Sequence, residues 1–112
     1  MDYKIRKIVD ELKENISKKY NLKELRVFGS SVRGDREKDS DIDVFVCLSN
    51  VNRKIEEDLF DMAYELELKY DCIIDLFVFD QSVYEGVNSY IPVYRNILKE
   101  GVSIWKMNTD RH

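Results

Sequence analysis

Apolar and polar residues follow a helical spacing in two long stretches of the chain. Apolar side chains recur there at intervals of three and four residues, with charged side chains between them, which is the pattern of an amphipathic helix. We therefore expect helices over about residues 2–19 and 52–70. The apolar positions are Ile5, Ile8, Val9, Leu12 and Ile16 in the first helix, and Ile55, Leu59, Met62, Ala63, Leu66 and Tyr70 in the second.

Four shorter apolar runs predict strands, because they are rich in β-branched and aromatic residues. They cover residues 25–28, 42–48, 72–79 and 102–105. The second run should be central in the sheet, and the third is apolar enough for a strand covered on both faces. A further helix should begin near Pro92 and end at Gly101, since proline suits the first turn of a helix.

This order of elements predicts an α/β domain with a small mixed β-sheet covered by helices. The first two strands either pair antiparallel across the polar loop between them or lie parallel through a short crossover, and the sequence leaves both arrangements open. A length of 112 residues suits one domain. We expect this domain to span residues 1–107, with a flexible tail over residues 108–112.

Charge and hydropathy exclude some classes of function. Lys and Arg total 18 against 22 Asp and Glu, for a net charge of -4, so the basic excess that broad nucleic-acid binding needs is absent. No apolar run approaches the ~20 residues of a membrane span, and we expect a cytoplasmic protein without membrane contact. Cys47 and Cys72 lack zinc-binding spacing, so we expect two buried free thiols.

A glycine-serine pair, Gly29-Ser30, directly follows the first predicted strand. Glycine lets a backbone approach a ligand closely, and the exposed N–H groups and hydroxyl suit phosphate oxygens. The alternative is an ordinary turn in which Ser30 or Ser31 caps the next helical turn. Taken alone, the pair does not decide between them.

Three carboxylates form the second candidate feature. Asp41 and Asp43 flank Ile42, and the two-residue period of a strand sends both carboxylates to one face. Such a pair repels unless a cation neutralises it, and Mg²⁺ prefers these oxygen ligands; the alternative is a solvated strand start. Asp75 interrupts an apolar strand, so it should face a cation or a cleft, unless it lies at an edge or pairs with Arg or Lys.

Together these residues predict in-line nucleotidyl transfer. A triphosphate held at the Gly-Ser turn would meet metal ions bound by the carboxylates, which activate an attacking hydroxyl and stabilise the leaving oxygen. The spacing Gly-Ser-x10-Asp-x-Asp is expected about 0.003 times by chance in a chain of this composition. Chance is therefore a poor explanation of the pattern.

The same spacing resembles the signature of the minimal nucleotidyltransferase (MNT) domains of the DNA polymerase β-like superfamily. Asp75 stands at the place of that family's third carboxylate, and residues 31–34, Ser40 and residues 91–101 are also similar. Lys38 is a departure, since many members carry proline there. The resemblance covers nearly the whole chain and implies the polymerase β-like nucleotidyltransferase fold.

The resemblance also implies roles for single residues. Gly29 and Ser30 would bind the triphosphate of ATP, and Arg33 either stabilises its charge or is a solvated loop arginine. Asp41 and Asp43 would bind Mg²⁺, with two ions expected. Asp75 would complete the metal cluster and help to deprotonate the acceptor hydroxyl.

Stand-alone MNT proteins resemble the antitoxins of HEPN/MNT toxin–antitoxin pairs, in which AMP from ATP is transferred to a tyrosine of a HEPN ribonuclease. The resemblance thus implies a protein adenylyltransferase that acts as an antitoxin, with a HEPN toxin as partner. Two alternatives stay open: an antitoxin that neutralises by binding alone, and a nucleotidyltransferase with a small-molecule acceptor. The sequence leaves the acceptor residue and a homo-oligomeric state open.

Overall fold

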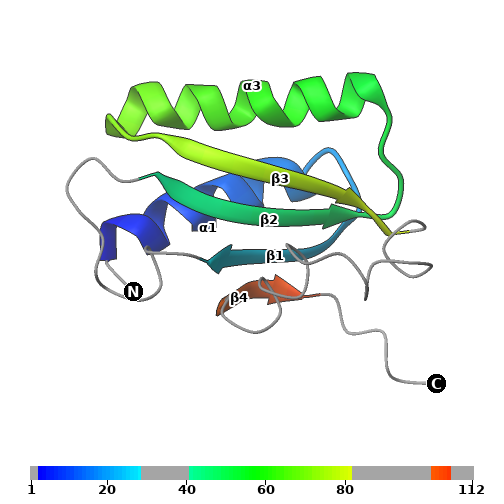
Figure 1. The fold of residues 1–112 in the computed structure, drawn as a ribbon, viewed down its shortest axis with the longest axis horizontal. Helices are drawn as coiled ribbons and strands as arrows, with labels where there is room; N and C mark the ends of the chain where they lie inside the picture. Colours follow the sequence, from blue (N-terminus) through cyan, green and yellow to red (C-terminus); the bar gives the residue numbers. More distant parts are fainter. Residues whose placement is uncertain (1–2, 29–40, 82–101, 107–112) are drawn as a thin grey trace.

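The computed structural model of the chain describes residues 3–28, 41–81 and 102–106 (Figure 1). Its helices and strands fall where the hydrophobic pattern predicts them, within a few residues at each end. The predicted phosphate turn, the helix expected over residues 92–101 and the tail over residues 108–112 lie outside the described residues. The elements are α1 (Tyr3–Ser17), β1 (Leu22–Phe28), β2 (Ile42–Leu48), α3 (Arg53–Tyr70), β3 (Ile74–Asp80) and β4 (Val102–Lys106).

The strands form one mixed sheet in the order β3-β2-β1-β4. β1 pairs antiparallel with both β2 and β4, whereas β2 and β3 are parallel. The antiparallel pairing of β1 with β2 settles the alternative that the sequence left open, and β2 has a strand on either side, as predicted. Parallel neighbours need a crossover connection, which α3 provides between β2 and β3.

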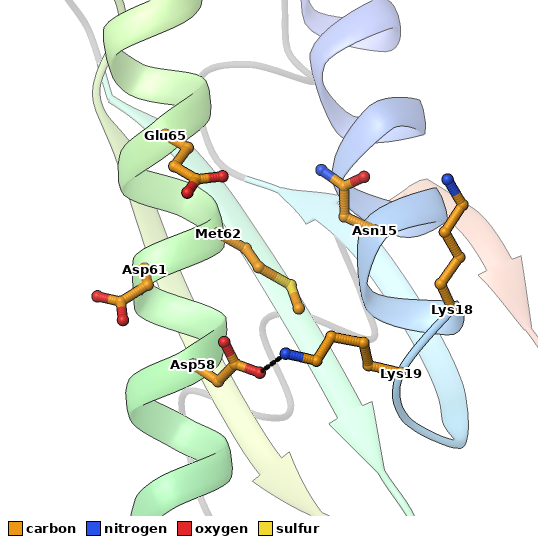
Figure 2. Close-up of a pocket in the computed structure, with 7 residues that line it drawn as sticks. All are labelled: Asn15, Lys18, Lys19, Asp58, Asp61, Met62 and Glu65. Carbon is orange, nitrogen blue, oxygen red and sulfur yellow. Dashed lines mark hydrogen bonds and ion pairs between the residues drawn. The ribbon is translucent and has the colours of Figure 1, made fainter.

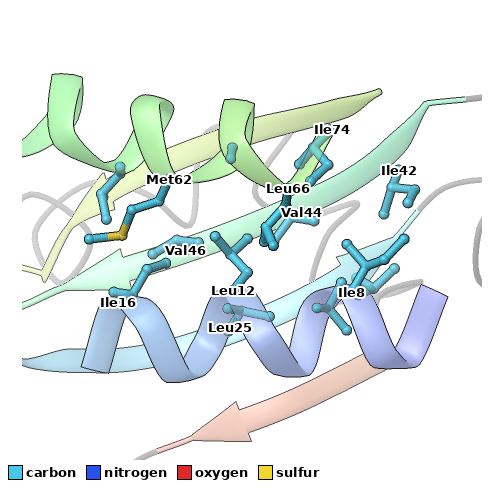
Figure 3. Close-up of a cluster of buried hydrophobic side chains, with 14 of the residues drawn as sticks. Ile8, Leu12, Ile16, Leu25, Ile42, Val44, Val46, Met62, Leu66 and Ile74 are labelled. Atoms are coloured by element: carbon cyan, nitrogen blue, oxygen red, sulfur yellow. The ribbon is translucent and has the colours of Figure 1, made fainter. Parts of the chain in front are cut away.

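Both described helices cover one face of the sheet, and the main core lies between them and the strands (Figure 3). Every second residue of β2 points into this core, together with the apolar stripes of α1 and α3. This confirms the expected α/β sheet covered by helices. The central core residues include Ile8, Leu12 and Ile16 of α1, Leu25 of β1, Ile42, Val44 and Val46 of β2, and Leu59 and Leu66 of α3.

Strand β3 and the side chain of Cys72 are less buried than the sequence suggested. The side chains of β3 beyond Asp75 are half-buried, so the expectation of a strand covered on both faces is wrong. β3 lies at the edge of the described sheet and has a strand neighbour on one side there. Cys47 is buried and Cys72 is half-buried, and neither forms a disulfide.

Within the described ranges, no helix has the length and apolar character needed to cross a bilayer.

The end of α1 is clamped onto α3 by an ion pair and a hydrogen bond. Lys19 Nζ lies 2.7 Å from Asp58 Oδ2, and the Tyr20 hydroxyl donates to the same oxygen at 2.5 Å. These two donors stabilise the charged carboxylate and lower the pKa of Asp58.

The end of α3 repeats this arrangement in the opposite direction. Lys69 Nζ lies 2.8 Å from Glu11 Oε2 of α1, and the Tyr70 hydroxyl donates to Glu11 Oε1 at 2.6 Å. The hydrogen bonds from Lys69 and Tyr70 lower the pKa of Glu11. The residues just after α1 thus contact a carboxylate of α3, and the end of α3 contacts a carboxylate of α1, so the two contacts join the helices.

Candidate active site

The face of the sheet opposite the helices carries the first of the predicted carboxylates. In the strand register, Phe28 of β1 pairs with Asp43 of β2, and Asp43 pairs with Asp75 of β3. Directly paired residues of neighbouring strands point to the same face, and neighbouring strands lie about 4.8 Å apart. Asp43 and Asp75 therefore stand side by side, while their neighbours Ile42 and Ile74 point into the helix-covered core.

Asp41 joins this acidic row from the residue just before β2. The backbone N–H of Ile42 donates to Ile73 O at 2.8 Å, which aligns the starts of β2 and β3. Asp75 reaches solvent, yet partial burial of its carboxyl group raises its pKa, and the charge of Asp41 and a hydrogen bond with it raise the pKa further. The charge of Glu67 acts in the same direction. The row therefore concentrates negative charge at the beginning of two parallel strands.

Glu67, in the last turn of α3, forms hydrogen bonds with the segment that connects α3 to β3. Its carboxylate Oε2 accepts a hydrogen bond from the backbone N–H of Ile74 at 2.7 Å, and its carbonyl oxygen accepts one from Cys72 N at 3.2 Å. The chain turns through Asp71, whose φ of 54° lies in the left-handed region that Asp tolerates. Glu67 thereby holds the residue that precedes Asp75.

Glu67 was not singled out from the sequence, although a signal was present. An acid in the last turn of a helix faces the negative end of the helix dipole, which is unfavourable unless the carboxylate finds a donor. The donor is the N–H of Ile74, only seven residues further on. An acid in the last turn just before a tight helix-to-strand connection is therefore a candidate for holding that connection.

Aromatic rings lie next to the acidic row on the same face of the sheet. The ring of Phe28 lies 5.3 Å from that of Phe77, and the ring of Phe45 lies 4.9 Å from that of Phe79, both in tilted contact. Phe45 is fully buried. Tilted aromatic pairs of this kind pack favourably and hold the strands that carry the carboxylates in a fixed relation.

A buried ion pair completes the described part of this face. Glu24 is only 3% exposed and contacts the guanidinium Nε of Arg26, two residues further along β1. The register places Arg26 opposite Phe45 and Glu24 opposite Cys47. A buried carboxylate is tolerated when a cation and hydrogen bonds compensate it, and Arg26 supplies this cation on the strand that leads to Phe28.

The structure brings together Asp41, Asp43 and Asp75, and the other predicted site residues lie outside the described residues. These are Gly29, Ser30 and Arg33. Phe28, the last described residue before the predicted phosphate turn, pairs in register with Asp43. Within residues 3–28 and 41–81, no group of three or more His, Cys, Asp or Glu side chains is arranged to hold a metal ion. The three-carboxylate metal cluster stays a prediction.

A shallow groove of about 360 Å³ lies elsewhere, between the end of α1 and α3 (Figure 2). The ion pair between Lys19 and Asp58 crosses it. Its walls come from the helix layer, whereas the acidic row lies on the other face of the sheet, so the groove is separate from the candidate active site. Its lining residues are Asn15, Lys18, Lys19, Asp58, Asp61, Met62 and Glu65.

Comparisons with known proteins identify the family of this chain. The model of the nucleotidyltransferase domain family matches residues 5–104. A Methanocaldococcus jannaschii protein named "Putative protein adenylyltransferase MJ0141" is 30% identical over 79 residues, which are 68% of this chain and 80% of the relative. Both matches span the acidic row.

Solved structures share the fold. A chain of a toxin–antitoxin complex with AMP-PNP aligns with a TM-score of 0.67 at 20% identity, over 94% of this chain and 76% of that one. A chain of the complex of tri-AMPylated Shewanella oneidensis HEPN toxin with MNT antitoxin aligns with a TM-score of 0.57 at 21% identity, over 93% of this chain and 71% of that one. Because the family model matches most of its length, the chain belongs to the nucleotidyltransferase domain family and is a nucleotidyltransferase.

Proposed function

We propose that this nucleotidyltransferase transfers AMP from ATP to a tyrosine hydroxyl of a HEPN ribonuclease toxin, depends on Mg²⁺ and acts as the antitoxin. The observation that carries the proposal is the acidic row, in which Asp43 and Asp75 stand in register with Asp41 beside them. The name of the archaeal relative supports a protein acceptor, and the toxin–antitoxin complexes with the same fold support the partner. We place the reaction in the cytoplasm.

The acidic row fits Mg²⁺ by the chemistry of its donors. Carboxylate oxygens are the ligands that Mg²⁺ prefers, and it commonly binds through one or two of them together with substrate phosphates. Partial burial, together with the negative charges of Asp41 and Glu67, raises the pKa of Asp75, and a cation bound beside its carboxylate would offset these effects. When bound, Mg²⁺ supplies Lewis-acid stabilisation of the phosphate charge and lowers the pKa of the attacking hydroxyl.

The proposed roles combine the register of the carboxylates with the roles that the family resemblance implies for Gly29, Ser30 and Arg33. Asp41 and Asp43 hold the metal, while Gly29 and Ser30 bind the triphosphate beside them and Arg33 stabilises its charge. Asp75, which completes the metal cluster, accepts the proton of the acceptor hydroxyl. The acceptor oxygen forms a bond to the α-phosphorus of ATP, the bond from that phosphorus to the bridging oxygen breaks, and pyrophosphate leaves with the electron pair.

The proposal is tested with purified protein, ATP labelled at the α-phosphate and HEPN-domain proteins from the same genome. We expect label to enter the HEPN protein with Mg²⁺ and to be absent with EDTA. Labelling of added small hydroxyl compounds in place of the HEPN protein would support a small-molecule acceptor. Neutralisation of the toxin without any labelling would support an antitoxin that acts by binding alone.

A further inference from the structure

We propose that the outward face of α3 is the docking surface for the protein partner, and that the occupant presents an apolar strip flanked by Lys and Arg side chains. The surface is centred on Phe60, Tyr64 and Leu68, which we call the α3 ridge. The inference rests on the proposed function, because it presumes that the acceptor of AMP is a protein. It adds to that function the surface that recognises this acceptor.

The α3 ridge is apolar, exposed and continuous. Its three residues are spaced four apart, so they follow one another along one face of the helix. Phe60 is 46% exposed, Tyr64 58% and Leu68 67%. Single exposed apolar residues are common, but a row of large ones on one helix face is typical of an interaction site. The core-facing residues of α3 are Leu59, Met62, Ala63 and Leu66, so the ridge is not needed for the protein's own core.

The ridge is flanked by negative charge. Glu57, Asp61 and Glu65 are exposed, and each stands three residues before a member of the ridge, which places it beside that member on the helix. Over its whole length α3 has more acidic than basic side chains. Its acids are Glu56, Glu57, Asp58, Asp61, Glu65 and Glu67, and its bases are Arg53, Lys54 and Lys69.

This charge identifies the kind of occupant. A second copy of the chain would bring the same acidic flanks against the ridge, and like charges brought together at an interface cost affinity. A partner with basic side chains around an apolar strip would bury the ridge and attract its acidic flanks, and both effects favour binding. A ribonuclease has such basic side chains, because a protein that binds RNA needs them to contact the phosphates.

The ridge also leads toward the acidic row. α3 crosses over to β3 at the edge of the described sheet (Figure 1), and the ridge ends at Leu68, one residue after Glu67. Ile73, which is 52% exposed, lies between the end of the helix and Asp75. A partner seated along α3 therefore lies next to the connection that leads from the helix to Asp75.

The test compares two variants of the full chain by isothermal titration calorimetry, which measures their affinity for the HEPN-domain protein from the same genome that the wild type labels with AMP. Phe60→Ser/Tyr64→Ser removes the centre of the ridge. Tyr3→Ser is the matched control, because Tyr3 is 82% exposed on α1, outside the ridge. We expect the ridge variant to bind at least about tenfold more weakly and the control to bind as the wild type does. Circular dichroism confirms that both variants are folded.

A charge-reversal variant keeps the inference falsifiable even if the serine variant folds poorly. Asp61→Lys/Glu65→Lys leaves the apolar ridge intact, and we expect weaker binding with a smaller loss of affinity as salt is added. Wild-type affinity in the charge-reversal variant and in a folded ridge variant would overturn the docking surface. A ridge variant that loses self-association while its affinity for the HEPN protein is unchanged would overturn it in favour of a second copy. A wild-type chain that neither binds nor modifies the HEPN protein would instead overturn the proposed function itself.

Discussion

Asp43 and Asp75 are paired in direct register on the parallel strands β2 and β3. This register is set by the core on the opposite face, where Ile42 and Ile74 pair in the same way one residue earlier. A slip of β3 by one residue would turn Asp75 into the apolar core and Ile74 out of it, which the packing forbids. The apolar side chains under the helices therefore fix the relation of two carboxylates on the other side of the sheet.

Replacing Asp43 should separate activity from stability. Asp43→Asn keeps the size of the side chain but removes a charged oxygen ligand, so we expect AMP transfer to fall by about 100-fold or more. The free energy of unfolding should change little, because Asn has nearly the same shape and residues 43 and 75, which are paired in register, no longer carry like charges. Transfer rates and urea unfolding curves measure the two effects. An inactive variant that is also strongly destabilised would contradict the assigned role.

The raised pKa of Asp75 predicts a pH-dependent effect on stability. A carboxyl group with a raised pKa in the folded state stabilises the protein below its ordinary pKa, and this stabilisation is lost as the pH rises through the raised value. Without Mg²⁺, Asp75→Asn should therefore increase the free energy of unfolding at pH 7. The increase should vanish as the pH falls toward the ordinary Asp pKa of 3.8.

Urea unfolding at a series of pH values checks this prediction, with Asp61→Asn on the exposed face of α3 as the matched control. A gain for Asp75→Asn that is equal at low and neutral pH would contradict the idea that the cost of charging the partly buried Asp75 causes it. Added Mg²⁺ should favour the wild type over Asp75→Asn, because a bound cation stabilises the charged carboxylate.

Substitutions of Glu67 test whether its hydrogen bond to the N–H of Ile74 positions the start of β3. Glu67→Gln keeps an oxygen acceptor for the N–H of Ile74, whereas Glu67→Ala leaves that partly buried N–H without its partner, at a cost of about 1–3 kcal/mol. We expect the Ala variant to lose stability and transfer activity and the Gln variant to retain most of both. Hydrogen exchange of the Ile74 amide should speed up in the Ala variant alone. Equal exchange in the two variants would contradict the positioning role.

The clamp on Glu11 predicts a loss of stability in acid. Lys69 and Tyr70 lower the pKa of Glu11, so its charged form stabilises the fold above the ordinary carboxyl pKa. This contribution is lost as the pH falls through the lowered value. Glu11→Gln should therefore be less stable than the wild type at pH 7, and the difference should shrink at low pH. Thermal unfolding across this pH range measures the effect, and a constant difference would contradict it.

The hydrophobic pattern predicted the elements, while the pairing of strands depended on contacts distant in the sequence. The same-face placement of residues 41 and 43 follows from the two-residue period of a strand. The register of Asp43 with Asp75 does not, because α3 and the core that it covers decide where β3 begins. Glu67 was missed for the same reason, since its hydrogen bond to Ile74 depends on the turn after α3. The half-buried state of β3 likewise depends on its edge position, which its apolar sequence does not reveal.

The central claim is that the acidic row transfers AMP to a protein acceptor. Its most direct test is the intact mass of a HEPN-domain protein from the same genome after co-expression with the wild-type chain or with its Asp41→Asn/Asp43→Asn variant. Each transferred AMP adds about 329 Da, by the chemistry of adenylylation. We predict such increments with the wild type and none with the variant. An unmodified HEPN protein in both cases, still bound and neutralised by the wild type, would contradict the claim and leave an antitoxin that acts by binding alone.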